Sequence, residues 1–386
     1  MILDRTPPWM TEERQALHET AYRFARREAD TGLDRWRRQQ HIDRDFFLKA
    51  GELGLLACAV PTEYGGGGGT HLDDFVVLDA FVRAGLAPAP FQMHCVVAPH
   101  YYVEYGNDEQ RRKWLPGLAS GQLLGALAMT EPDTGSDIQA IRARAERDGG
   151  GYLITGTKIF ITNGAQADLV IVAASTDRGA RGKGLSLFVL ETKDCPGFEV
   201  GRSLEKLGQH ESDTAELSFD HVRVPAANRL GEEGDGFAML MGQLPMERLV
   251  VAITSQAAIE AGLDLTVKYV NERHAFGKPL IAQQHIRFEI ADCLMRARVS
   301  GAFLDSCLAQ LERAELDDVT AAMAKCWLSD EEWQILDRCT QLFGGYGYMA
   351  EQPIANYFIN ARIQKVYGGT NEIMREIIGR AATTRA

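Results

Sequence analysis

Apolar residues recur every three to four positions along residues 1–122, and this spacing predicts a helical N-terminal domain. Thr11, followed by Glu12 and Glu13, predicts a capped start for the first helix, because carboxylates favour the positive end of the helix dipole. The glycine run Gly65–Gly69 could cradle a phosphate, but no Lys-Ser/Thr pair follows it, so a mobile loop is the better interpretation. Further helices are expected over residues 46–56, 72–84, 91–105 and 108–118.

Between residues 123 and 235 the apolar period changes from 3.6 to two, which is typical of strands. Strands are predicted over residues 152–162, 169–174, 185–190 and 215–219. The helical period then returns in long amphipathic segments over residues 239–272, 280–311 and 317–342. Long helices joined by short loops indicate an antiparallel bundle. A last helix is expected over residues 372–382. We therefore predict a mainly α chain with a central β domain, divided into an N-terminal helical domain (1–122), a small antiparallel β-barrel (123–235) and a C-terminal antiparallel helix bundle (236–386).

Composition narrows the class of protein. The formal net charge of −12 argues against a nucleic-acid-binding surface. The seven cysteines include no C-x-x-C pair, so buried, reduced thiols are expected and a metal site is not. Without an apolar leader or a run of 18 apolar residues, we expect a cytoplasmic protein with no membrane segment. No G-x-G-x-x-G fingerprint is complete, which disfavours a dinucleotide-binding Rossmann fold.

Two stretches in the central domain carry candidate chemistry. The apolar run from Leu123 to Met129 ends in Thr130-Glu131-Pro132-Asp133-Thr134-Gly135-Ser136-Asp137, which predicts a short buried strand and a polar loop. The second stretch, Lys158–Gly164, is an alternating strand closed by an Asn-Gly turn. Hydroxyls and free backbone N–H groups at the end of a rigid strand suit a polar, partly aromatic ligand, although an ordinary strand and turn would give the same pattern.

Together these stretches resemble the T-E-P-x-x-G-S-D and K-x-x-I-T-N-G motifs of the acyl-CoA dehydrogenase family, and the resemblance covers essentially the whole chain. It implies an FAD-dependent oxidoreductase that converts an acyl-CoA to the trans-2-enoyl-CoA. Such a reaction needs a carboxylate to take the Cα proton, donors to stabilise the enolate and a flavin whose N5 accepts the Cβ hydride.

The position of the base departs from the pattern of many family members. Where they have Tyr-Glu-Gly-Thr, this chain has Tyr367-Gly368-Gly369-Thr370, and glycine cannot accept a proton. Glu247 stands in a Glu-Arg-Leu segment of the first bundle helix, which resembles the branch that acts on long-chain and isovaleryl thioesters. We therefore assign Glu247 as the base and expect burial to raise its pKa toward neutrality. The alternative is a surface carboxylate beside Arg248.

The resemblance also implies the binding residues. The flavin ring would be held by the segment of Met129, Thr130 and Ser136 and by Phe160 and Thr162, although Phe160 could instead belong to the core. Ser136 would also contact the substrate. The remaining substrate contacts would come from Arg248, Gly368 and Gly369, with the Gly368 N–H in the oxyanion hole and Arg248 holding Glu247 or the Gly368 loop.

A second set of residues would bind the FAD pyrophosphate and adenosine across a subunit boundary. The motifs R-x-x-F-G…Q and Q-x-F-G-G supply Arg273, Phe276, Gln284, Gln341 and Gly345. Thr370 and Glu372 open the last helix, whose N–H groups suit a polar cofactor segment, although Thr370 could serve as a cap alone.

The resemblance finally implies a homotetramer, a dimer of dimers, that passes electrons to a soluble electron-transfer flavoprotein. A flavin oxidase of the same fold, a dehydrogenase acting on acyl carrier protein thioesters in secondary metabolism, and a non-catalytic FAD-binding protein remain alternatives. Retention of Glu247 together with the flavin motifs argues against the last of these.

Overall fold

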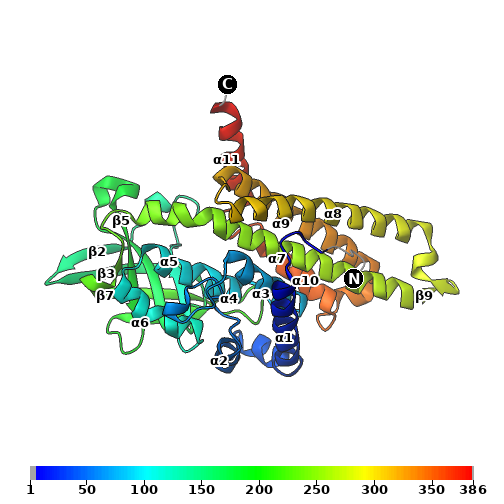
Figure 1. Cartoon of the computed structure of the whole chain (residues 1–386), viewed down its shortest axis with the longest axis horizontal. Coiled ribbons are helices and arrows are strands. Elements are labelled where there is room, and N and C mark those ends of the chain that lie inside the picture. The colour runs from blue at the N-terminus through cyan, green and yellow to red at the C-terminus, as the bar shows by residue number, and fades with distance from the viewer. Residues whose placement is uncertain (1–5, 385–386) are drawn as a thin grey trace.

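The computed structural model describes residues 6–384, whose elements follow the predicted order of helices, sheet and helices (Figure 1). Thr11 caps the first helix by accepting a hydrogen bond from the Arg14 N–H, as its sequence context predicted. The N-terminal helices are α1 (Glu12–Gln39), α2 (Arg44–Glu52), η1 (Thr62–Tyr64), α3 (His71–Arg83), α4 (Ala89–Phe91), the π-helical turn η2 (Gln92–Val97), α5 (Ala98–Tyr105) and α6 (Asp108–Ala119).

The glycine run Gly65–Gly69 forms a hydrogen-bonded loop, and that this loop is mobile stays a prediction. The Gly68 and Gly69 N–H groups donate to the carbonyl oxygens of Val60 and Cys58, each at 2.9 Å. A Cβ on Gly66 would lie 2.2 Å from the Val60 carbonyl oxygen, so this backbone approach needs glycine. The glycines therefore allow the loop that precedes α3 to pack closely against the backbone of Cys58 and Val60.

The central domain is one mixed sheet that is mostly antiparallel. Its order is β6-β7-β3-β2-β4-β5-β8, with β1 beside β4, and the pairings β1–β4 and β2–β4 are parallel. This strand order ends at β6 on one side and at β8 on the other, so within residues 6–384 the hydrogen-bonded sheet is not closed. The sequence had predicted an antiparallel barrel. The strands are β1 (Gly125–Ala128), β2 (Arg144–Asp148), β3 (Gly151–Thr162), β4 (Leu169–Ser175), β5 (Leu185–Glu191), β6 (Phe198–Ser203), β7 (Thr214–Pro225) and β8 (Arg229–Leu230).

The C-terminal helices form the predicted bundle, and the last of them projects away from it with the C-terminus (Figure 1). A small hairpin, β9 (His274–Ala275) and β10 (Lys278–Pro279), joins the first two long helices at the far end of the molecule. The helices are α7 (Gly236–Glu272), α8 (Gln284–Glu312), α9 (Asp318–Leu342), α10 (Pro353–Gln364) and α11 (Asn371–Thr384). Helix α10 was not expected from the sequence.

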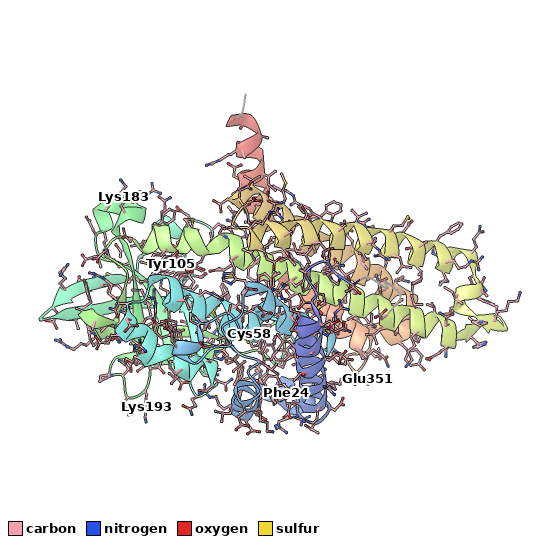
Figure 2. All side chains as sticks on the ribbon, in the orientation of Figure 1. Phe24, Cys58, Tyr105, Lys183, Lys193 and Glu351 are labelled. Carbon is pink, nitrogen blue, oxygen red and sulfur yellow. The ribbon has the colours of Figure 1, made fainter. Side chains whose placement is uncertain are left out.

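Helix α7 runs from the sheet, past the N-terminal helices, to the far end of the bundle (Figure 1). Within residues 6–384 it is the one helix that is long and apolar enough to cross a membrane, and 78% of its most apolar window is buried inside the protein. Leu249, Val250 and Ile253 of α7 share a core with the N-terminal helices. Tyr105, labelled in Figure 2, donates its hydroxyl to the Met239 carbonyl oxygen at 3.1 Å, so α5 also packs on α7.

The seven cysteines are all unpaired in the described chain, and six of them are buried. Cys195 is half-buried. The predicted domain boundaries fall between α6 and β1 and between β8 and α7, and as boundaries they stay predictions.

Candidate active site

Glu247 lies on the buried part of α7, with 8% of its surface exposed. The Tyr101 hydroxyl of α5 donates to Glu247 Oε1 at 3.0 Å. Burial raises the pKa of Glu247 to about 7, against smaller lowering effects of the Tyr101 hydrogen bond and the Arg248 charge. Its position rules out the surface carboxylate considered above, and the expected rise in pKa is confirmed.

The loop that carries Gly368 packs against the same part of α7. A Cβ on Gly368 would lie 3.5 Å from Val251 Cγ2, and Val251 is one helical turn beyond Glu247. Gly368 and Gly369 also have left-handed backbone angles, φ +63° and +86°, which glycine adopts without strain. The fold therefore places Gly368, where many family members have the catalytic carboxylate, close to the part of α7 that carries Glu247.

Lys325 of α9 fixes this loop, although no motif in the sequence points to it. Its Nζ is buried and donates to the Gly369 carbonyl oxygen at 2.7 Å and to Asn371 Oδ1 at 2.8 Å. Arg248, which we expected to hold the loop or Glu247, instead donates to the Asp318 carbonyl oxygen at 3.3 Å. Within residues 6–384, Arg248 Nε is a buried donor without a partner, so a polar group of a bound molecule would satisfy it.

The two motifs of the central domain are held together by Lys158. Its buried ammonium donates to a Glu131 carboxylate oxygen at 2.9 Å and to the Met129 carbonyl oxygen at 2.8 Å. The backbone also joins them, since the Ile159 N–H donates to the Thr130 carbonyl oxygen at 2.9 Å. Met129 and Thr130 are thereby set next to the end of β3, which carries Phe160 and Thr162.

Phe160 is not a core residue, because 64% of its surface is exposed. Its φ of +61° is rare for a bulky residue and costs energy, which is a feature typical of functional positions. Thr130 and Thr162 are half-buried, and Ser136 is exposed on the loop that follows β1. An open aromatic face with hydroxyls beside it fits the planar, polar-edged ring of a flavin.

The second set of predicted cofactor residues gathers at the other end of the molecule. Figure 1 places β9 at the opposite end from β3, so one chain does not bring the two sets together. The Arg273 guanidinium lies 5.7 Å from the centroid of the Tyr346 ring, next to Gly345. All five residues of this set are exposed, namely Arg273, Phe276, Gln284, Gln341 and Gly345.

Thr370 and Glu372 lie at the start of α11, as predicted. Thr370 Oγ1 accepts a hydrogen bond from the Ile373 N–H at 3.3 Å, so its capping role is present in the chain alone. Glu372 is exposed, and backbone hydrogen bonding at the helix start lowers the pKa of its carboxyl.

Family models for the N-terminal, middle and C-terminal domains of acyl-CoA dehydrogenase match residues 11–122, 126–222 and 234–383. The chain belongs to the acyl-CoA dehydrogenase family. It is 40% identical to the rat (Rattus norvegicus) mitochondrial long-chain specific acyl-CoA dehydrogenase, over 96% of this chain and 86% of that protein. It is 33% identical to mitochondrial isovaleryl-CoA dehydrogenase of Pongo abelii, over 96% and 89%. The crystal structure of an acyl-CoA dehydrogenase from Geobacillus kaustophilus superposes with a TM-score of 0.95 at 38% identity, covering 98% of this chain and all of that one.

Membership confirms the predicted fold, the enzyme class and the cofactor. Acyl-CoA dehydrogenases are FAD enzymes that oxidise a CH–CH bond, and the exposed aromatic and hydroxyl groups at the end of β3 fit such a cofactor. The likeness to long-chain and isovaleryl enzymes agrees with the branch that the Glu-Arg-Leu segment indicated. The roles of individual residues stay predictions.

Proposed function

We propose that this acyl-CoA dehydrogenase removes the Cα proton of its acyl thioester with Glu247. The observation that supports this assignment is a buried carboxylate whose helix packs against the Gly368 loop. With a pKa of about 7, the carboxylate is substantially ionised near neutral pH and yet basic enough to accept a proton. Tyr101 occupies Oε1, so Oε2 is the oxygen that we assign to the Cα proton.

The remaining predicted site residues would bind and orient FAD and the acyl thioester. When bound, FAD supplies the hydride acceptor; Met129, Thr130, Phe160 and Thr162 would hold its ring, and Ser136 would contact both ring and substrate. The Gly368 N–H would donate to the thioester oxygen and stabilise charge that develops there as the proton leaves. Lys325 holds that loop in place through the Gly369 carbonyl oxygen.

An anaerobic titration of the FAD-loaded protein with acyl-CoAs of increasing length and branching tests the proposed reaction. We expect at least one acyl-CoA to bleach the oxidised flavin, with formation of one enoyl-CoA per flavin. An acyl carrier protein thioester in the same series tests the carrier. If every thioester left the flavin oxidised, the protein would be a non-catalytic FAD binder and the proposal would be wrong.

We further propose a soluble electron-transfer flavoprotein as the electron acceptor. After reduction by substrate, electrons must leave before the next turnover. The chain is similar, at 34% identity and a TM-score of 0.92, to a chain in a solved structure of the electron transferring flavoprotein of Acidaminococcus fermentans, which supports such a protein as the acceptor. Steady-state turnover should therefore depend on added electron-transfer flavoprotein, with little oxygen uptake in its absence. Rapid oxygen uptake would instead identify a flavin oxidase.

The proposed assembly is a homotetramer, a dimer of dimers. Each FAD would join the flavin-ring residues of one subunit to the Arg273 end of another, because one chain separates them. The outer face of α8 supports subunit contact, since Phe288, Met295 and Val299 are 59%, 60% and 60% exposed and recur at helical spacing. Large exposed apolar side chains in a row are typical of an interface.

Met295→Lys should weaken this assembly, because it places a charge in the centre of the apolar face. We expect a lower mass by light scattering and roughly tenfold weaker retention of FAD, the scale of a moderately destabilised interface. Leu48→Lys, a matched change at an exposed apolar residue of α2, should leave both properties unchanged. An unaltered mass for Met295→Lys would exclude α8 from the interface.

A further inference from the structure

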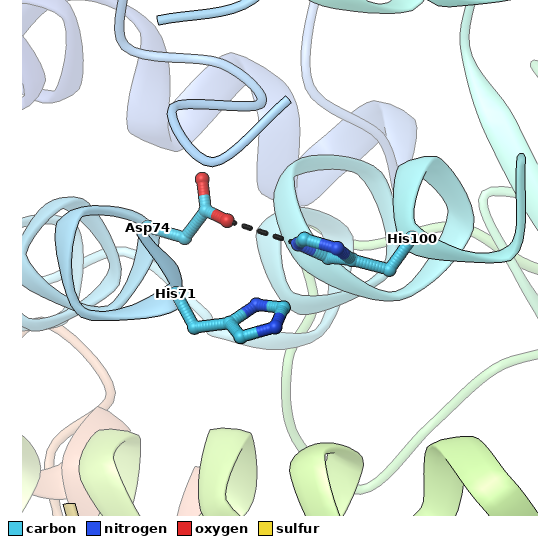
Figure 3. Close-up of side chains that lie close together, drawn as sticks. All are labelled: His71, Asp74 and His100. Carbon is cyan, nitrogen blue, oxygen red and sulfur yellow. Dashed lines mark hydrogen bonds and ion pairs between the residues drawn. The ribbon is translucent and has the colours of Figure 1, made fainter. Parts of the chain in front are cut away.

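His71, Asp74 and His100 form a compact cluster in the N-terminal domain (Figure 3). His71 and Asp74 come from the first turns of α3, and His100 comes from α5. One ligating atom from each residue lies within 4.8 Å of the others. None of the three belongs to the proposed active site. His100 is 26 residues beyond Asp74, so the three form no recognisable spacing motif, and no metal site was expected from the sequence.

The geometry is close to that of a metal centre. Asp74 Oδ2 and His100 Nε2 are 3.1 Å apart, and the rings of His71 and His100 have centroids 4.3 Å apart. Bonds of about 2.0–2.2 Å to a tetrahedral zinc ion place neighbouring ligand atoms roughly 3.3 Å from one another. The Asp74–His100 pair already has this separation, and His71, whose ligating atom lies within 4.8 Å of both, would have to move closer to complete the set.

The surroundings also fit a ligand. His71 Nδ1 is buried and, within residues 6–384, has no hydrogen-bond partner, which is a costly state for an imidazole nitrogen. The Ala59 N–H donates to Asp74 Oδ1 at 3.3 Å and orients the carboxylate, as outer hydrogen bonds do in metal sites. The His71 side chain is half-buried, whereas Asp74 and His100 are buried, so His71 is the member of the cluster nearest to solvent.

We propose that His71, Asp74 and His100 bind one divalent first-row transition cation, for which Zn²⁺ is the probe. Two imidazoles and a carboxylate are the ligands that such ions prefer, and a water would complete the coordination. The ion would join the start of α3 to α5. Since His100 directly precedes Tyr101, it would brace the helix that supports Glu247.

The test uses the full-length, FAD-loaded protein after metal removal with a chelator and dialysis. Titration with Zn²⁺ against a colorimetric zinc indicator should show one ion bound per chain, with a higher melting temperature at saturation. Co²⁺ should give the visible absorption of a protein-bound ion at wavelengths beyond the flavin bands. Both readouts are independent of enzyme activity.

His71→Gln should weaken Zn²⁺ binding at least about a hundredfold, since even outer hydrogen bonds to metal ligands are worth about ten- to a hundredfold. The matched control is His18→Gln, because His18 Nε2 also lies 2.8 Å from a carboxylate, that of Asp79, and is outside the cluster. This control should keep the parent affinity. His71 is half-buried at the first position of α3, so its replacement leaves the core intact.

Three results would overturn the proposal. They are a parent protein that binds no stoichiometric Zn²⁺, a His71→Gln variant that binds it as tightly as the parent, and a His18→Gln variant that loses as much affinity as His71→Gln. In each case Asp74 and His100 would be an ordinary buried hydrogen-bonded pair with His71 beside it.

Discussion

A Glu247→Gln variant is expected to keep FAD and to bind acyl-CoA, yet to reduce its flavin at least about a hundredfold more slowly than the parent, the scale of a lost general base. Glutamine has nearly the same shape, and its carbonyl oxygen can still accept the Tyr101 hydrogen bond. It cannot accept the Cα proton near neutral pH. Anaerobic stopped-flow measurement of flavin bleaching at saturating substrate gives the rate directly.

Glu332→Gln is the matched control for this experiment. Glu332 of α9 is also buried, and burial raises the pKa of its carboxyl to about 8. It lies beside Ser255, two turns along α7 from Glu247. We expect a rate close to that of the parent. A large loss in Glu332→Gln together with a normal rate in Glu247→Gln would move the base to α9.

Tyr101→Phe should move the acidic limb of the pH–rate profile to higher pH. The base works only when ionised, and the Tyr101 hydrogen bond favours the ionised form, so removing it raises the pKa of Glu247 above about 7. A hydrogen bond to a charged group is worth about 1.5–3 kcal/mol, which corresponds to roughly one to two pH units. Flavin reduction should therefore be about ten- to a hundredfold slower below neutral pH and approach the parent rate in alkali.

Tyr102→Phe is the control for the hydrogen bond. Tyr102 is the next residue of α5 and is equally buried, but its hydroxyl has no hydrogen-bond partner in the described part of the chain. Removal of the Tyr102 hydroxyl should leave the pH–rate profile of flavin reduction unchanged. If Tyr101→Phe lowered the rate by the same factor at every pH, Tyr101 would hold the shape of the site without setting the pKa of Glu247.

The site could be predicted from the sequence where its residues are close together in the chain. The strand that carries Phe160 and the helix that carries Glu247 follow from local apolar periodicity, and the structure has both. The absence of a carboxylate at 368 pointed to a base elsewhere, and the packing of Gly368 on Val251 agrees with that reasoning. The choice of Glu247, however, came from family resemblance, since periodicity alone does not separate it from other helical glutamates.

Contacts between distant segments could not be predicted in this way. Lys325 occupies what a sequence presents as an ordinary position of an amphipathic helix, and its acceptors at Gly369 and Asn371 lie more than 40 residues away. The same holds for His71 and His100, which meet only because α3 packs beside α5. Strand β6 is exposed along nearly its whole length, so it has no alternating pattern to recognise.

The separation of β3 from the β9 hairpin has a consequence for handling the enzyme. In the homotetramer proposed above, a neighbouring subunit would complete each FAD site, so FAD would be retained only while subunits stay associated and its occupancy would depend on protein concentration. Dilution would then release FAD, and with it the yellow colour of the protein, before any chain unfolds. Activity measured at low enzyme concentration would report quaternary structure as much as chemistry.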